Sequence, residues 1–72
     1  MQLASTQINT YCCVRKMPKI PLLEALGVRT GVKLQVVGKQ PLKGPIVVKV
    51  GNRDIAIDRG IAQQIIVEGV SQ

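Results

Sequence analysis

Hydrophobic and polar residues alternate in two stretches near the middle of the chain, which is the pattern of a half-buried β-strand. Residues 32–37 read Val-Lys-Leu-Gln-Val-Val, and residues 46–50 read Ile-Val-Val-Lys-Val. The segment between them, residues 38–44, contains glycine and proline and is typical of a loop. The pattern therefore predicts a β-hairpin made of these two strands and this loop.

Three further strands are predicted on either side of the hairpin. Residues 11–17 form a stretch that a proline ends, and residues 54–57 follow a Gly-Asn turn signal that favours a tight hairpin. Residues 66–70 form the last strand. Residues 1–10 are mostly small and polar, so we expect loose structure there that tightens towards the first strand.

Two short helices are also predicted. Residues 21–26 begin with proline, which the first helical turn tolerates, and carry three leucines on one face before Gly27 ends the helix. Asp58 is the expected N-cap of a helical turn at residues 59–64. Helices this short are unstable alone and must pack against the sheet. The 72 residues thus predict one mainly β domain, a small barrel of about five strands with one or two short helices.

Charge and residue content narrow the chemistry. Ten basic and four acidic residues give a net charge of +6, which favours an anionic partner such as nucleic acid or an acidic protein surface. The chain has no histidine, so the commonest general base is missing, and its four carboxylates are separated and form no recognisable cluster. We therefore expect no enzyme activity, no catalytic residue, no metal site and no cofactor.

The two cysteines, Cys12 and Cys13, are adjacent, and neighbours on a strand point to opposite faces. They do not form a disulfide framework, so we expect a reducing, cytoplasmic location. No apolar run approaches the length of a membrane span, and the first residues lack the pattern of a signal peptide.

The chain resembles the FeoA family of bacterial ferrous iron uptake. The resemblance covers roughly residues 20–68 and begins with Leu-Gly-Val-Arg-Thr-Gly-Val-Lys-Leu-Gln-Val at residues 26–36. It continues with Gly-Pro-Ile-Val-Val-Lys-Val at residues 44–50 and ends with Ile-Val-Glu within a tail that starts at Ala62. It implies an SH3-like β-barrel and a non-catalytic role in support of FeoB, the GTPase-linked ferrous iron permease. Any membrane association would then come only through that partner.

The predicted partner-binding surface is the loop at residues 38–44 together with two arginines expected nearby. An exposed leucine between two lysines offers an apolar contact inside a basic rim, as protein interfaces often do. The candidate residues are Arg29, Lys39, Pro41, Leu42, Lys43 and Arg53.

Two alternatives stay open. One is a small basic barrel that binds nucleic acid, although Tyr11 is the only aromatic residue available for stacking on bases. The other is a metal-sensing SH3-like domain related to the C-terminal domain of iron-dependent repressors.

Overall fold

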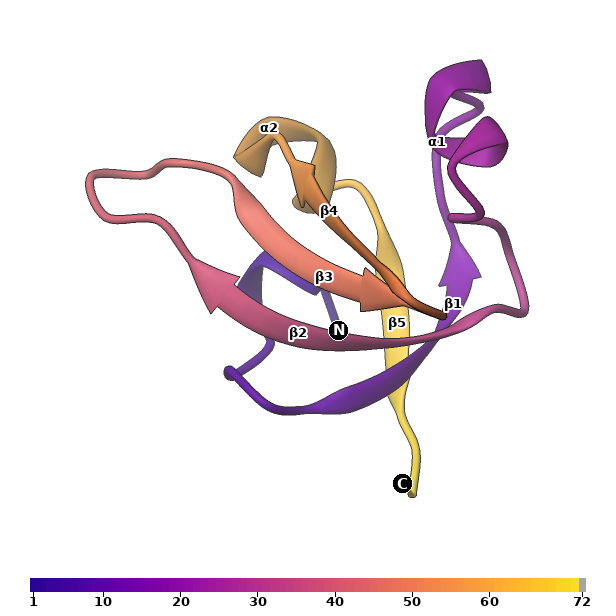
Figure 1. Cartoon of the computed structure of the whole chain (residues 1–72), viewed down its shortest axis with the longest axis horizontal. Helices are drawn as coiled ribbons and strands as arrows, with labels where there is room; N and C mark the ends of the chain where they lie inside the picture. The colour runs from indigo at the N-terminus through magenta and orange to yellow at the C-terminus, as the bar shows by residue number, and fades with distance from the viewer. Residues whose placement is uncertain (72) are drawn as a thin grey trace.

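The computed structural model describes residues 1–71 as a curved antiparallel sheet with two short helices at its ends (Figure 1). The predicted five strands and two helices are all present. In chain order the elements are the 3₁₀ turn η1 (Leu3–Ser5), β1 (Tyr11–Lys16), α1 (Pro21–Ala25), β2 (Lys33–Lys39), β3 (Ile46–Val50), β4 (Arg53–Ile57), α2 (Arg59–Ala62) and β5 (Ile66–Gly69).

The strands lie in the order β4-β3-β2-β1-β5, and each neighbouring pair is antiparallel. The register shifts in β2 between Val36 and Gly38 and in β1 between Val14 and Lys16. Such irregularities increase strand twist and bending. They allow a five-stranded sheet to curl around one aliphatic core. None of the helices among residues 1–71 is long and apolar enough to cross a membrane.

The core is built from the positions that the alternating pattern indicated. Leu34, Val36, Ile46, Val48 and Ile57 are each at most 2% exposed. Their charged neighbours along the same strands face solvent, as the period of two requires. The core also receives one side chain from α1 and residues from α2 and β5.

The N-terminal segment differs from the expected loose structure. Leu3 is fully buried, and its backbone N–H donates to the carbonyl of Ile65 at 2.8 Å. Met1 and Val67 exchange hydrogen bonds in both directions, at 2.8 and 3.0 Å. The segment thus covers the outer edge of β5, which satisfies backbone groups that an edge strand would otherwise leave unpaired. Ala4 and Thr6 of this segment are buried as well.

Both helices end close to where the sequence indicated, but α1 buries less than expected. Leu23 is 6% exposed, whereas Leu22 is 69% exposed and Leu26 is half-buried. A helix of five residues makes little more than one turn, so only one leucine faces the core. Gly27 follows with φ of +99°, the left-handed conformation that glycine adopts without penalty.

The N-cap of α2 is confirmed. The Asp58 carboxylate accepts hydrogen bonds from the backbone N–H groups of Gly60 at 2.9 Å and Ile61 at 3.4 Å. These are two of the helix donors that have no partner inside the helix.

Candidate functional site

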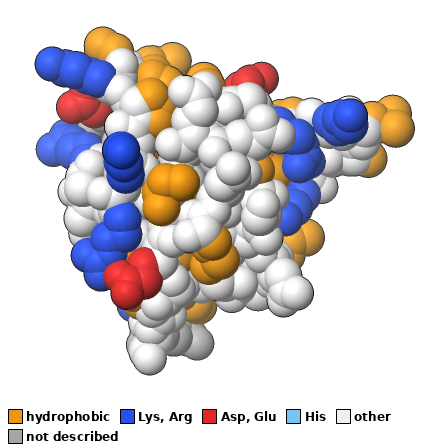
Figure 2. Space-filling view, turned by 180° about the vertical axis from the view of Figure 1, so that it is seen from behind, with side chains coloured by type: hydrophobic (Ala, Val, Ile, Leu, Met, Phe, Trp, Pro, Cys, Tyr) orange, Lys and Arg blue, Asp and Glu red, His pale blue; other side chains and the backbone are white. Residues whose placement is uncertain are grey.

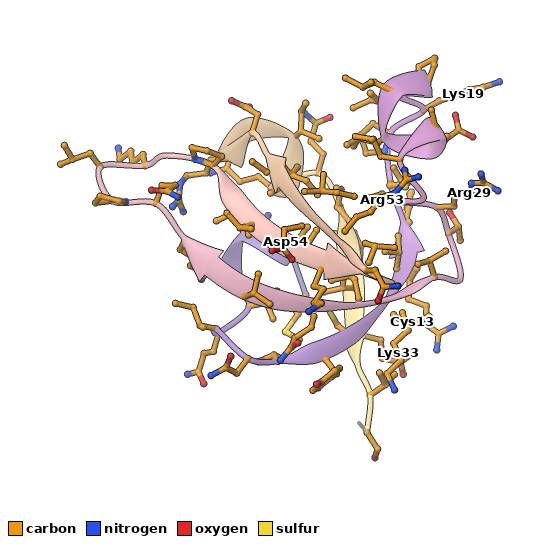
Figure 3. The ribbon with its side chains drawn as sticks, viewed as in Figure 1. Cys13, Lys19, Arg29, Lys33, Arg53 and Asp54 are labelled. Carbon is orange, nitrogen blue, oxygen red and sulfur yellow. The ribbon has the colours of Figure 1, made fainter. Side chains whose placement is uncertain are left out.

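The predicted partner-binding residues lie at two opposite ends of the molecule. The loop at residues 38–44 projects from one end of the β2–β3 hairpin, and α1 lies at the other end (Figure 1). Arg29 and Arg53 belong to the α1 end (Figure 3). The expectation that they lie near the loop was therefore wrong. Arg29 precedes β2 and the loop follows it, and a strand of seven residues separates its ends by roughly 20 Å at about 3.3 Å per residue.

The tip of the loop is a tight turn that presents a leucine to solvent. The N–H of Gly44 donates to the carbonyl of Pro41 at 3.1 Å, and the two residues between them, Leu42 and Lys43, have φ of +57° and +61°. Two successive left-handed residues define a type I′ turn, which usually contains asparagine or glycine. Leu42 is 99% exposed. A Cβ at position 44 would lie 2.6 Å from the Cβ of Gln40, so only glycine fits there.

The base of the loop is fixed by two basic side chains. Lys39 Nζ donates to the carbonyl of Ala4 at 3.1 Å, and Arg59 Nε donates to the carbonyl of Gly44 at 3.2 Å. Lys39 is half-buried and ties the hairpin to the N-terminal turn, so it is not the free rim cation that the sequence suggested. Lys43 remains exposed beside Leu42. No feature of the sequence indicated the role of Arg59.

A second set of basic residues lies at the α1 end. Arg29 Nε donates to the carbonyl of Glu24 near the C-terminus of α1, at 3.1 Å. The same arginine lines a pocket of about 210 Å³ between the segment that leads into α1 and the turn that leaves it. The pocket is lined by Met17, Pro18, Lys19, Glu24, Arg29 and Thr30. The sequence interpretation did not include Lys19, because its place beside Arg29 depends on the path of the chain around α1.

Few of the positive charges are neutralised. Within residues 1–71 the one ion pair joins Arg15 to Glu68 on the exposed face of β1 and β5. The hydrogen bond to Glu68, and then its charge, raise the pKa of Arg15. From behind, Lys and Arg side chains line the edge of the molecule at the α1 end, and others flank the protruding loop (Figure 2).

The cysteines and the single tyrosine offer little for metal or base binding. Both cysteines are free; Cys12 is buried, and burial together with the neighbouring Cys13 raises the pKa of its thiol. Three or more cysteine and carboxylate side chains that could hold one metal ion are not found together within residues 1–71. Lys33 Nζ lies 5.4 Å from the centre of the Tyr11 ring, a cation–π contact that occupies one face of that ring.

Comparisons with known proteins give a consistent result. A family model described as the FeoA domain matches residues 1–69. Iron(II) transport protein A from Clostridium thermocellum is similar in its solution structure, with 30% identity and a TM-score of 0.87 over 97% of this chain. This chain spans 46% of that protein's chain, less than half of its length.

Two further solved structures share the fold. The FeoA protein from Chlorobium tepidum has 27% identity and a TM-score of 0.88, covering 99% of this chain and 71% of that one. FeoA from Stenotrophomonas maltophilia, described as a prokaryotic SH3 domain protein and complexed with zinc, has 24% identity and a TM-score of 0.77, covering 94% and 89%. The latter similarity establishes the SH3-like fold alone. A search of curated proteins found no match.

Proposed function

Because this chain belongs to the FeoA family, we propose that it is a cytoplasmic, non-catalytic accessory protein of bacterial ferrous iron uptake that binds the GTPase-containing cytosolic part of a FeoB-type permease. The family membership supports the link to iron transport. The SH3-like fold supports a binding role, although a fold alone does not fix a function.

The observation that carries the partner-binding proposal is the turn at the tip of the loop. Leu42 is almost completely exposed, although contact of an apolar side chain with water is unfavourable. It is held in this position by a turn in which two non-glycine residues adopt the left-handed conformation, which costs free energy. Lys43 adds a cation beside it, and Pro41 limits the freedom of the preceding backbone. A small apolar anchor with a charged neighbour is the kind of group that fills a pocket on a partner. We assign Leu42 and Lys43 as the contact residues.

The test is the affinity of the full chain for the purified cytosolic region of the permease from the same organism, by isothermal titration calorimetry. Burying a leucine contributes about 1.5–3 kcal/mol, so L42S should weaken binding by roughly tenfold or more. The matched control is L22S, which removes the other strongly exposed leucine from the opposite end of the molecule. If L42S binds as tightly as the parent chain, or if L22S weakens binding equally, the loop is not the contact surface.

The contribution of charge is tested in the same assay by replacing single lysines. K43E should weaken binding, and the effect should shrink as salt is added, because the contact is exposed. K49E is the control, since Lys49 is an exposed lysine near the end of β3 that lies away from the loop. Lys39 is left unchanged, because its bond to Ala4 would make any effect structural. Equal losses for K43E and K49E would indicate unspecific charge attraction and contradict the assignment.

The nucleic-acid alternative is less well supported, because the only aromatic ring already contacts Lys33. Titration of the chain with single-stranded RNA at low salt addresses it directly. Affinity that falls steeply with salt would favour that function over the permease. The metal-sensing alternative is addressed by titration with Fe(II), in which unchanged amide chemical shifts would exclude it.

A further inference from the structure

The edge of the sheet at β4 has backbone groups without partners. β4 pairs only with β3 within residues 1–71, through a hairpin whose two-residue turn lies between Val50 and Arg53. In such a hairpin the residues next to the turn form a hydrogen-bonded pair, and alternate residues then point their N–H and C=O groups away from the partner strand. In β4 these are Asp54 and Ala56. Both are exposed, and neither takes part in the backbone bonds made outside the strands.

The opposite edge of the sheet, at β5, does have partners for its backbone groups. The outer edge of β5 is covered by residues 1–3, because Met1 exchanges backbone hydrogen bonds with Val67 and Leu3 donates to Ile65, the residue before β5. β4 has no such cover in residues 1–71, and its edge carries neither a lysine nor a proline. An uncovered edge of this kind is a template for an added strand.

Arg53 connects this edge to the basic residues at the α1 end. Ile55 and Ile57 point into the core, so the period of two places Arg53 on the same face, at the point where the core ends. Its side chain lies at the α1 end of the molecule, as do Lys19 and Arg29 (Figure 3). The contact between the two segments is close, since a Cβ on Gly27 would lie 3.6 Å from Val50, the pairing partner of Arg53.

The three cations come from separate segments: the loop before α1, the turn after it, and the β3–β4 hairpin. Within residues 1–71, Lys19 and Arg53 make no ion pair or side-chain hydrogen bond, and Arg29 makes its one bond to a neutral carbonyl. Asp54 does not neutralise Arg53, because it lies on the opposite face of β4. Glu24 is the one carboxylate in the pocket lining, so positive charge is in excess.

We propose that β4 and the α1 end form a second binding surface, which takes an extended acidic segment of a partner protein as an additional strand. The segment pairs with the free backbone groups of Asp54 and Ala56. Its carboxylates lie against Arg53, Arg29 and Lys19. This surface is separate from the loop at residues 38–44, so it does not depend on the function proposed above.

The unpaired N–H and C=O groups of β4 indicate which class of partner fits this surface. A lipid bilayer would satisfy the cations and contact the exposed Leu22, but it offers nothing to the β4 edge. A second copy of this chain could pair through β4, but each copy carries a net charge of +6 and the arginines would meet cations rather than acids. An acidic strand satisfies both the backbone groups and the charges.

The experiment uses the ¹⁵N-labelled full chain and a synthetic capped peptide of alternating glutamate and valine, seven residues long. Binding should shift the amide signals of β4 and the α1 end, and should slow hydrogen exchange at Asp54 and Ala56 by tenfold or more at saturation. The matched probe replaces each valine with proline. It has the same charge but cannot donate ladder hydrogen bonds, so it should bind at least tenfold more weakly and give no protection.

Variants separate the two parts of the surface. R53E should weaken binding of the glutamate–valine peptide by tenfold or more without changing the fold. L42S should leave the affinity for this peptide unchanged. A56P removes one outward N–H at an edge position that tolerates proline, and should abolish protection at Asp54. Shifts spread evenly over all exposed lysines, equal affinity of the proline peptide, shifts produced instead by phosphatidylglycerol vesicles, or a doubling of molecular mass without peptide would each overturn the proposal.

Discussion

Replacing Leu3 with alanine should destabilise the domain by about 3 kcal/mol, although the residue lies almost at the start of the chain. Its side chain is fully buried, and truncating a buried leucine removes transfer free energy and leaves a cavity, for a total of about 2–5 kcal/mol. A domain of 72 residues has a total stability of about 4–11 kcal/mol at 0.05–0.15 kcal/mol per residue. The loss is therefore a large fraction of the whole.

The assay is urea unfolding followed by far-ultraviolet circular dichroism, which is suited to a chain with no tryptophan. With an m-value of about 1 kcal/mol/M for a small domain, the midpoint should fall by about 3 M. L22A is the control, since Leu22 is 69% exposed, and its midpoint should change by less than about 0.5 M. If L3A is unfolded at the outset, L3M measures the same site, with an expected loss below about 1.5 kcal/mol. Equal midpoints for L3A and L22A would refute the burial of Leu3.

Three further predictions concern stability. D58A removes the N-cap of α2 and should lower the free energy of unfolding in urea by about 1 kcal/mol. D54A is the control and should change it little, because the Asp54 carboxylate does not cap a helix. G27A forces alanine to φ of +99° and should cost about 1 kcal/mol or more in the same assay, while G69A, which does not have positive φ, should cost less. Burial and the neighbouring Cys13 raise the pKa of the Cys12 thiol, so the folded protein holds this proton more strongly than the unfolded chain does. The resulting contribution to stability is complete below about pH 9 and is lost as the pH rises through the folded pKa. The urea midpoint of the parent chain should therefore fall as the pH is raised above about 9, and that of C12A should fall less.

The strands could be predicted because their signal is local. Alternation at residues 32–37 and 46–50 fixes which face is buried, and the Gly-Asn pair and Asp58 mark a turn and a helix start through their own backbone chemistry. The N-terminal segment could not be predicted in this way. Leu3 is an isolated large apolar residue in a segment of mostly small and polar residues, and its burial depends on pairing with the segment around β5, which lies more than sixty residues away in sequence.

The candidate site was predicted in part for the same reason. The exposure of Leu42 follows from a loop signal that the sequence contains. The positions of Arg29 and Arg53 depend on the length of β2 and on which end of the sheet α1 covers, and neither is a local property. Lys39 illustrates the limit further, because its acceptor, the carbonyl of Ala4, belongs to a segment that was expected to be loose.

The length of β2 has a consequence for how the two proposed surfaces work together. Leu42 lies at the loop end and Arg53 at the α1 end of a molecule whose longest Cα extent is 29 Å, while β4 runs from Arg53 back towards the base of the loop, where Ile57 pairs with Ile46. A partner that contacts only the tip of the loop at Leu42 leaves the Arg53 end of β4 free. The two ligands should therefore bind at the same time. The calorimetric affinity for the permease region should change by less than about twofold when the acidic peptide is present at saturation, because sites more than about 10 Å apart that share no contact residue act independently. Competition between the two would mean that they share one surface, and that the acidic strand approaches the hairpin loop rather than the α1 end.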